Sequence, residues 1–145
     1  NNDSVEAATI LQELKINIAD IPDETNFTTE APDAEDEATI SSAQLKSDVD
    51  SLFSTVAVRA ADSLRLSGRA LFDQSDFETA LEDYLLAFSF DPGNYRGNVA
   101  YYCGRCYQEL ERFDEAKPYF EYVVENFPSS ELAGYAANRI RMMGF

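Results

Sequence analysis

Apolar residues recur at helical spacing between residues 61 and 128, and this pattern predicts two pairs of helices. In the first pair, Leu64, Gly68 and Leu71 share one face of the first helix. A capping box at Ser75–Glu78 is then expected to begin the second helix, which Asp91–Gly93 ends. The predicted helices run over about 61–74, 77–90, 99–110 and 113–126.

The two pairs are related by an internal repeat with an offset of 36 residues. Small, aromatic and proline positions are each preserved at this offset, which indicates one repeated structural unit rather than chance. The matched positions are Gly68 with Gly104, Phe77 with Phe113, Ala80 with Ala116, Tyr84 with Phe120, and Pro92 with Pro128.

Two repeats cannot bury a continuous core alone, so further helices are expected to cover both ends. At the C-terminal side, the offset of 36 places Ala136, Ile140 and Met143 at core positions of a capping helix over about 131–143. At the N-terminal side, a helix over about 42–60 either covers the first repeat or runs directly into its first helix.

The repeat resembles the tetratricopeptide repeat (TPR) family. The first unit carries Leu64, Ser67-Gly68, Leu71, Ala80, Tyr84, Ala87 and Pro92, and the second carries Ala100, Cys103-Gly104, Tyr107, Ala116, Phe120 and Pro128. Departures are Ser67 and Cys103 at the usual Leu position, Val123 at the second Ala position, and two extra residues between repeats. The resemblance implies an all-α fold, a short α-solenoid of antiparallel helix pairs. Its domain would span 41–145, with repeats over about 61–94 and 97–130.

The family resemblance also implies a concave groove that binds a peptide. Arg69, Arg105 and Arg141 recur 36 residues apart and would form a column along it. A planar guanidinium suits carboxylate recognition, and local pairing with Asp62, Asp73 or Glu109 is the alternative interpretation. The candidate groove residues are Arg65, Arg69, Phe72, Asn98, Tyr101, Arg105, Gln108 and Arg141.

Residues 1–40 differ in composition from the remainder of the chain. Residues 3–19 predict a short amphipathic helix, in which Ala7, Leu11, Leu14 and Ile18 follow heptad spacing. We favour the end of a longer coiled coil over a helix that packs on the following domain, and a short strand over 15–21 is a further alternative. Residues 20–40 hold eight acidic residues and two prolines, which predicts an acidic linker.

Charge and composition exclude several kinds of chemistry. The net charge of −16, of which residues 1–50 carry −11, disfavours nucleic acid as a partner. The absence of His excludes Ser–His and Cys–His catalysis and mixed Cys/His zinc sites. Cys103 and Cys106 lie within a repeat helix, where core packing is favoured over redox chemistry. We therefore expect no catalytic residues, cofactor or metal.

These features predict a non-catalytic TPR module that binds protein or peptide as a scaffold or adaptor. The alternative is a structural oligomer, assembled through residues 4–21, with the repeats as a spacer or multivalent head. Family analogy implies a bacterial cell envelope location, held off a membrane by an upstream segment, and free thiols suit the cytoplasmic alternative. The acidic linker around Glu30–Glu37 is a candidate occupant of the groove in its own chain or a neighbour.

Overall fold

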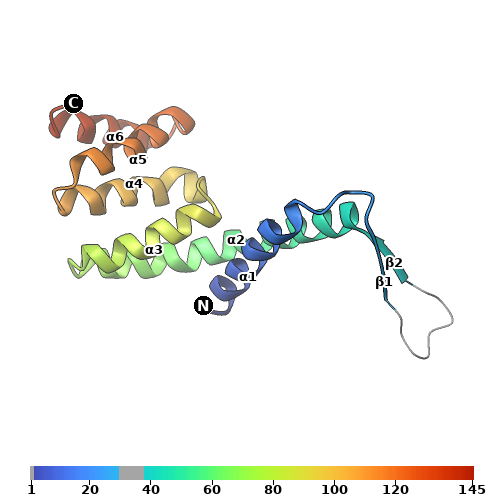
Figure 1. Ribbon diagram of the computed structural model, residues 1–145. Coiled ribbons are helices and arrows are strands. Elements are labelled where there is room, and N and C mark those ends of the chain that lie inside the picture. Colours follow the sequence, from blue (N-terminus) through green and yellow to red (C-terminus); the bar gives the residue numbers. More distant parts are fainter. Residues whose placement is uncertain (1, 30–37) are drawn as a thin grey trace.

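The computed structural model describes residues 2–29 and 38–145, and confirms an all-α helical-repeat fold (Figure 1). A small two-stranded antiparallel hairpin is the exception to the helical structure. The elements are α1 (Asn2–Ala19), β1 (Asn26–Thr29), β2 (Ala38–Ser41), α2 (Ser42–Asp73), α3 (Phe77–Phe90), α4 (Asn94–Glu109), α5 (Phe113–Asn126) and α6 (Glu131–Met142).

From α2 onward, each helix packs against the next one in the chain, and the stack in Figure 1 results. Contacts also join α2 to α4 and α4 to α6, so these three helices form one layer of the solenoid. The α3 and α5 helices form the other layer. The layered arrangement is that of an α-solenoid, in which each unit rests on its neighbours.

The turn inside each pair is repeated in three dimensions at the same offset of 36 residues. Ser75 (φ 64°) and Glu111 (φ 60°) both adopt the left-handed conformation. In each turn this residue donates its backbone N–H to the carbonyl three residues before it. The next residue donates to the carbonyl five residues before it, which is a Schellman-type helix end. The cap of α3 is Asp76, whose carboxylate accepts from the N–H of Thr79, so the predicted Ser75 cap is wrong.

A close contact between glycine and an aromatic ring fixes the spacing inside each pair. Tyr84 and Phe120 are fully buried and lie against Gly68 and Gly104. A Cβ atom on Gly68 would lie 2.9 Å from the Tyr84 ring, and one on Gly104 would lie 2.8 Å from the Phe120 ring. The absence of a side chain therefore allows the ring to reach the helix backbone.

The α2 helix is continuous from Ser42 to Asp73, so the predicted N-terminal helix runs into the first repeat helix. Antiparallel to it, α1 covers its N-terminal half, and Ala8 is fully buried in the main core. Lys15 pairs with Asp50 at 2.9 Å, while Leu14 of the predicted heptad seam is 37% exposed. Of the alternatives for this segment, the structure shows packing on the following domain.

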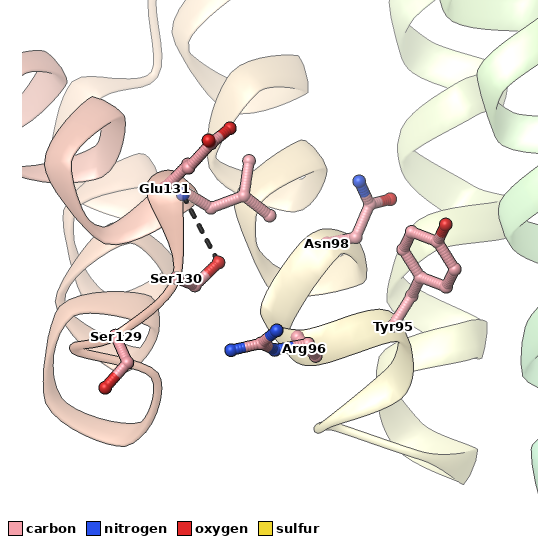
Figure 2. A pocket seen from close by; sticks show the side chains of 7 residues that line it. Tyr95, Arg96, Asn98, Ser129, Ser130 and Glu131 are labelled. Carbon is pink, nitrogen blue, oxygen red and sulfur yellow. Dashed lines mark hydrogen bonds between the residues drawn. The ribbon is translucent and has the colours of Figure 1, made fainter.

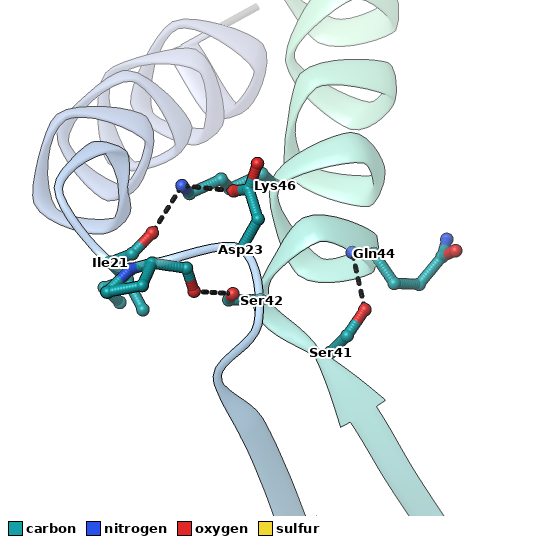
Figure 3. Close-up of polar contacts among 7 residues, drawn as sticks. Ile21, Asp23, Ser41, Ser42, Gln44 and Lys46 are labelled. Atoms are coloured by element: carbon teal, nitrogen blue, oxygen red, sulfur yellow. Dashed lines mark hydrogen bonds and ion pairs between the residues drawn. The ribbon is translucent and has the colours of Figure 1, made fainter.

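Polar contacts fix the connection between α1 and α2 (Figure 3). Lys46 Nζ donates to the carbonyl of Ile21 at 2.5 Å and pairs with Asp23 at 2.8 Å. The Ser42 hydroxyl donates to the carbonyl of Pro22. Ile21, Pro22 and Asp23, which follow α1, are therefore tied to the first turns of α2.

The predicted linker over 20–40 is partly ordered as a β-hairpin. Phe27 pairs with Ile40 and Thr28 with Thr39, and aromatic and β-branched residues favour strands over coil. The prediction of an unstructured linker is therefore wrong for both strands. The acidic segment 30–37 lies outside the described residues.

The α6 helix closes the stack as the repeat offset predicts. Ala136 is fully buried, and Ile140 and Met143 pack partly buried against the core. Within the described ranges, no helix is both long and apolar enough to cross a membrane.

We predict that Gly68→Ala and Gly104→Ala each lower the free energy of unfolding by about 1–3 kcal/mol, because the new methyl group overlaps the buried ring. Gly134→Ala is the matched control, since a Cβ there meets nothing within 4 Å. It should raise helix stability by about 0.5–1 kcal/mol. Urea denaturation followed by circular dichroism measures all three, and equal effects at the three positions would contradict the role of the contacts.

We also predict that Tyr84→Phe stabilises the protein by about 1 kcal/mol, because the buried Tyr84 hydroxyl has no hydrogen-bond partner among the described residues. The second repeat already has Phe120 at this position. Phe120→Tyr, which adds the same hydroxyl to the equivalent site, should destabilise by a similar amount. A loss of stability in Tyr84→Phe on urea denaturation would show that the hydroxyl is satisfied.

Candidate functional site

Two of the predicted arginines are joined through two aromatic rings on the α2–α4 layer. The Arg69 guanidinium lies 5.3 Å from the Tyr102 ring centroid and donates to the Tyr102 hydroxyl. The Arg105 guanidinium lies 5.1 Å from the Phe72 ring centroid. The Phe72 and Tyr102 rings meet edge to face at 5.3 Å. We call Arg69, Phe72, Tyr102 and Arg105 the arginine–aromatic cluster.

Three arginines of α2 and α4 each pair with an acidic residue on their own helix. Two of the pairs are Arg69–Asp73 at 3.0 Å and Arg105–Glu109 at 2.9 Å. The third is Arg65–Asp62 at 3.6 Å. The interpretation of local pairing is therefore confirmed for Arg69 and Arg105 of the predicted column. The hydrogen bond to Asp73 raises the pKa of Arg69, which remains a cation at any ordinary pH.

The two clustered arginines differ in their access to solvent. The Arg69 side chain is 53% exposed and its partner Asp73 is 57% exposed, whereas the Arg105 side chain is only 19% exposed. Burial lowers the pKa of Arg105, but hydrogen bonds with Glu109 and Tyr101 outweigh it and raise the pKa overall. Arg69 can therefore exchange partners readily, while Arg105 is held in place.

The remaining predicted groove residues on α4 and α6 do not extend the cluster. Tyr101 is 6% exposed and its ring packs against Phe120, so it offers little surface. Gln108 accepts a hydrogen bond from Arg139 at 3.4 Å. Arg141 bonds Asn138 on its own helix at 2.8 Å. The contact from α6 to Gln108 of α4 is therefore made by Arg139 rather than by Arg141, the third member of the predicted column.

Asn98 lies in a separate cavity of about 600 Å³ between the start of α4 and the start of α6 (Figure 2). Tyr95, Arg96, Ser129, Ser130, Glu131 and Leu132 complete its lining. The Arg65 guanidinium lies 4.6 Å from the Tyr95 ring centroid, so the cavity adjoins the layer that carries the arginine–aromatic cluster.

A left-handed turn at the start of α4 presents the side chains of Tyr95 and Arg96. Both residues have positive φ (49° and 56°), as has Gly97 (86°). A Cβ atom on Gly97 would lie 2.7 Å from the Phe127 ring, so glycine is required there by both conformation and space. Arg96 has no ion-pair partner in the part of the chain that the structure describes.

Sequence reasoning missed Tyr102, Tyr95 and Arg96. At the offset of 36 residues, Tyr102 aligns with Leu66, which is exposed. The repeat alignment therefore does not indicate that Tyr102 lies at the centre of the arginine–aromatic cluster. Tyr95 and Arg96 lie in the connection between repeats, where no periodic pattern applies. The contacts of all three depend on tertiary structure.

The cysteine pair lies inside the core. Cys103 and Cys106 are fully buried and form no disulfide. Burial raises the pKa of the Cys103 thiol well above its ordinary value and that of Cys106 to about 12. Both thiols are therefore protonated at neutral pH. No group of three or more metal-ligating side chains occurs in the described ranges.

No protein-family model, curated protein or solved structure matches the chain.

We predict that native Cys106 is alkylated by iodoacetamide at pH 8 at least about a thousandfold more slowly than a free thiol, because the thiol is fully buried and burial raises its pKa from 9 to about 12. Since the folded pKa is the higher one, the protonated thiol stabilises the fold below pH 9. This contribution is lost as the pH rises from 9 towards 12. Mass spectrometry of the alkylated protein, native and unfolded, measures the rates; similar rates in the two states would show an accessible thiolate.

Proposed function

We propose that the protein is a TPR-like, non-catalytic module that binds a protein or peptide segment along the α2–α4–α6 layer. The observation that carries the proposal is the arginine–aromatic cluster. Arginine and aromatic side chains are the residues most often responsible for affinity at protein interfaces. The adjoining cavity beside Asn98 supplies a concave surface at one end of the same layer.

The exposure of the ion pairs favours Arg69 as the main contact for an acidic ligand group. An exposed pair such as Arg69–Asp73 is worth only about 0–1 kcal/mol, so a ligand carboxylate can share or replace Asp73 at little cost. The planar guanidinium offers two parallel donors for such a carboxylate. Arg105, which is mostly buried, instead holds the Phe72 ring in place.

As a ligand for the cluster, the acidic segment 30–37 is proposed to come from a neighbouring molecule rather than from the same chain. Its flanking residues Thr29 and Ala38 lie at the end of α2 that is remote from the repeats (Figure 1). Arg69 is near the other end of α2, about 40 Å away at 1.5 Å per residue. A segment held at both ends cannot cover this distance, since its full extended length is about 30 Å. Such a contact requires a neighbouring molecule.

The role of scaffold or adaptor, and a place at the bacterial cell envelope, are parts of the same proposal and rest on the TPR resemblance. The alternative of a structural oligomer is favoured by one specific observation, the packing of α1 on α2. This packing buries only one side of each helix and leaves Ile10, Leu14 and Leu52 exposed.

We predict that Arg69→Gln weakens peptide binding at least tenfold, because the substitution removes the accessible cation of the cluster. Random peptides displayed on phage are selected against the full chain. The affinity of a selected, synthesised peptide is then measured by fluorescence polarisation, and we expect selected sequences to be rich in Asp and Glu.

Arg112→Gln is the matched control. Arg112 also pairs with an acidic residue of its own chain segment, Glu115, and lies over a ring, that of Tyr107 at 4.8 Å, but in the turn between α4 and α5. It should leave the affinity unchanged. Equal affinities for wild type and Arg69→Gln would contradict the proposed site, as would an equal loss in both variants.

A further inference from the structure

One side of the α1–α2 pair exposes apolar residues along both helices. On α1, Ile10 (57% exposed) and Leu14 lie one turn apart, and on α2, Leu52 is 56% exposed. The α2 residues Asp48, Leu52, Thr55 and Arg59 are spaced by four, three and four, so they lie along one side of the helix. We call Ile10, Leu14, Asp48, Leu52 and Arg59 the hairpin stripe.

The two halves of the stripe lie on the same face of the pair. The α3 helix meets α2 through contacts such as Phe53 with Phe90, at 6.4 Å. It also meets α2 at Gly68, which faces the Tyr84 ring. At 100° per residue, Leu52 and Arg59 lie about 160° and about 180° around α2 from Gly68. On α1, Val5 shares a small cavity with Asp83 of α3, and Ile10 and Leu14 lie on the opposite side of α1 from Val5. Both parts of the stripe are therefore turned away from α3.

The register of the pair brings the two halves to the same level. Lys15 contacts Asp50, and Lys46 contacts the carbonyl of Ile21. Because the two helices are antiparallel, a residue of α1 and a residue of α2 lie at the same level when their numbers add up to about 66. The point midway between Ile10 and Leu14 therefore lies level with the point midway between Asp48 and Arg59.

The stripe is complementary to itself when two copies face each other across a two-fold axis. This axis lies at the same level, between the two stripes, and runs perpendicular to the helices. It places Ile10 against Leu14 of the partner subunit, and Asp48 against Arg59 of the partner subunit, each contact occurring twice. Within the described ranges Arg59 has no hydrogen-bond or ion-pair partner. Asp48 accepts only from Gln44, at 2.7 Å. Self-complementarity is what an isologous interface requires of a surface, and no unrelated partner imposes it.

We propose that the hairpin stripe binds a second copy of this chain, forming an antiparallel four-helix bundle from α1 and α2 of each copy. Two helices alone bury little, and among the described residues before the repeats only Ile18, Val49 and Ser42 are buried outside the main core. A second pair packed on the stripe supplies the missing layer, and two Asp48–Arg59 ion pairs fix its register. This inference does not depend on peptide binding, since the stripe and the arginine–aromatic cluster share no residue.

Sedimentation equilibrium of the full chain tests the proposal, with an expected mass twice the chain mass of 16.2 kDa. Leu14→Glu and Leu52→Glu should each raise the dissociation constant of the dimer at least about a hundredfold, because each buries two unpaired charges in the interface. Ile16→Glu is the matched control, because Ile16 is also exposed (68%) but lies on the other side of α1. It should leave the dimer intact, and circular dichroism confirms folding of every variant.

A charge exchange tests the register. Asp48→Arg and Arg59→Glu should each weaken the dimer about tenfold, and the double variant should restore it. A protein that stays monomeric at every concentration overturns the proposal, and so does a dimer that is insensitive to Leu14→Glu and Leu52→Glu. A dimer that depends on both leucines but is not restored in the double variant overturns the antiparallel two-fold arrangement.

Discussion

The contact of a glycine with an aromatic ring in each helix pair sets the spacing on which the rest of the structure depends. Gly68 and Gly104 let Tyr84 and Phe120 lie directly on a helix backbone, so each pair packs at close range. The Tyr84 ring in turn stacks on Tyr102 of the next pair at 5.2 Å. The Arg69 guanidinium lies over the same Tyr102 ring. The position of the arginine–aromatic cluster thus follows from the packing of the core beneath it, and a change in helix spacing would separate Arg69 from Tyr102.

The repeat offset was sufficient to predict the helices of the repeats and the residues of their core. It works because each repeat buries equivalent positions, so Tyr84 and Phe120, or Ala100 and Ala136, meet the same environment. Spacing within one helix also predicted the local partners of Arg69 and Arg105, because a helix places residues three or four apart side by side. These are properties of local geometry, which sequence spacing specifies.

The offset fails where contacts between distant segments decide the outcome. Arg141 has the correct spacing for the column, yet Arg139 is the residue that meets Gln108, and Arg141 bonds Asn138 of its own helix. The fold-back of α1 depends on Lys46, which binds the connection through Ile21 and Asp23. The heptad spacing of α1 is compatible with several partners and does not identify α2 as the one it contacts.

The continuity of α2 links the two proposed surfaces. Its first half carries part of the hairpin stripe and its last turns carry Arg69 and Phe72, with no break in the helix between them. Two copies joined through the stripe would therefore hold their clusters at a fixed separation and in a fixed relative orientation. A ligand with two acidic segments at the matching spacing would bind the second cluster intramolecularly, which raises the apparent affinity without any new contact. A stiff helix makes this gain depend sharply on the ligand spacing, because α2 cannot bend to accommodate a mismatch.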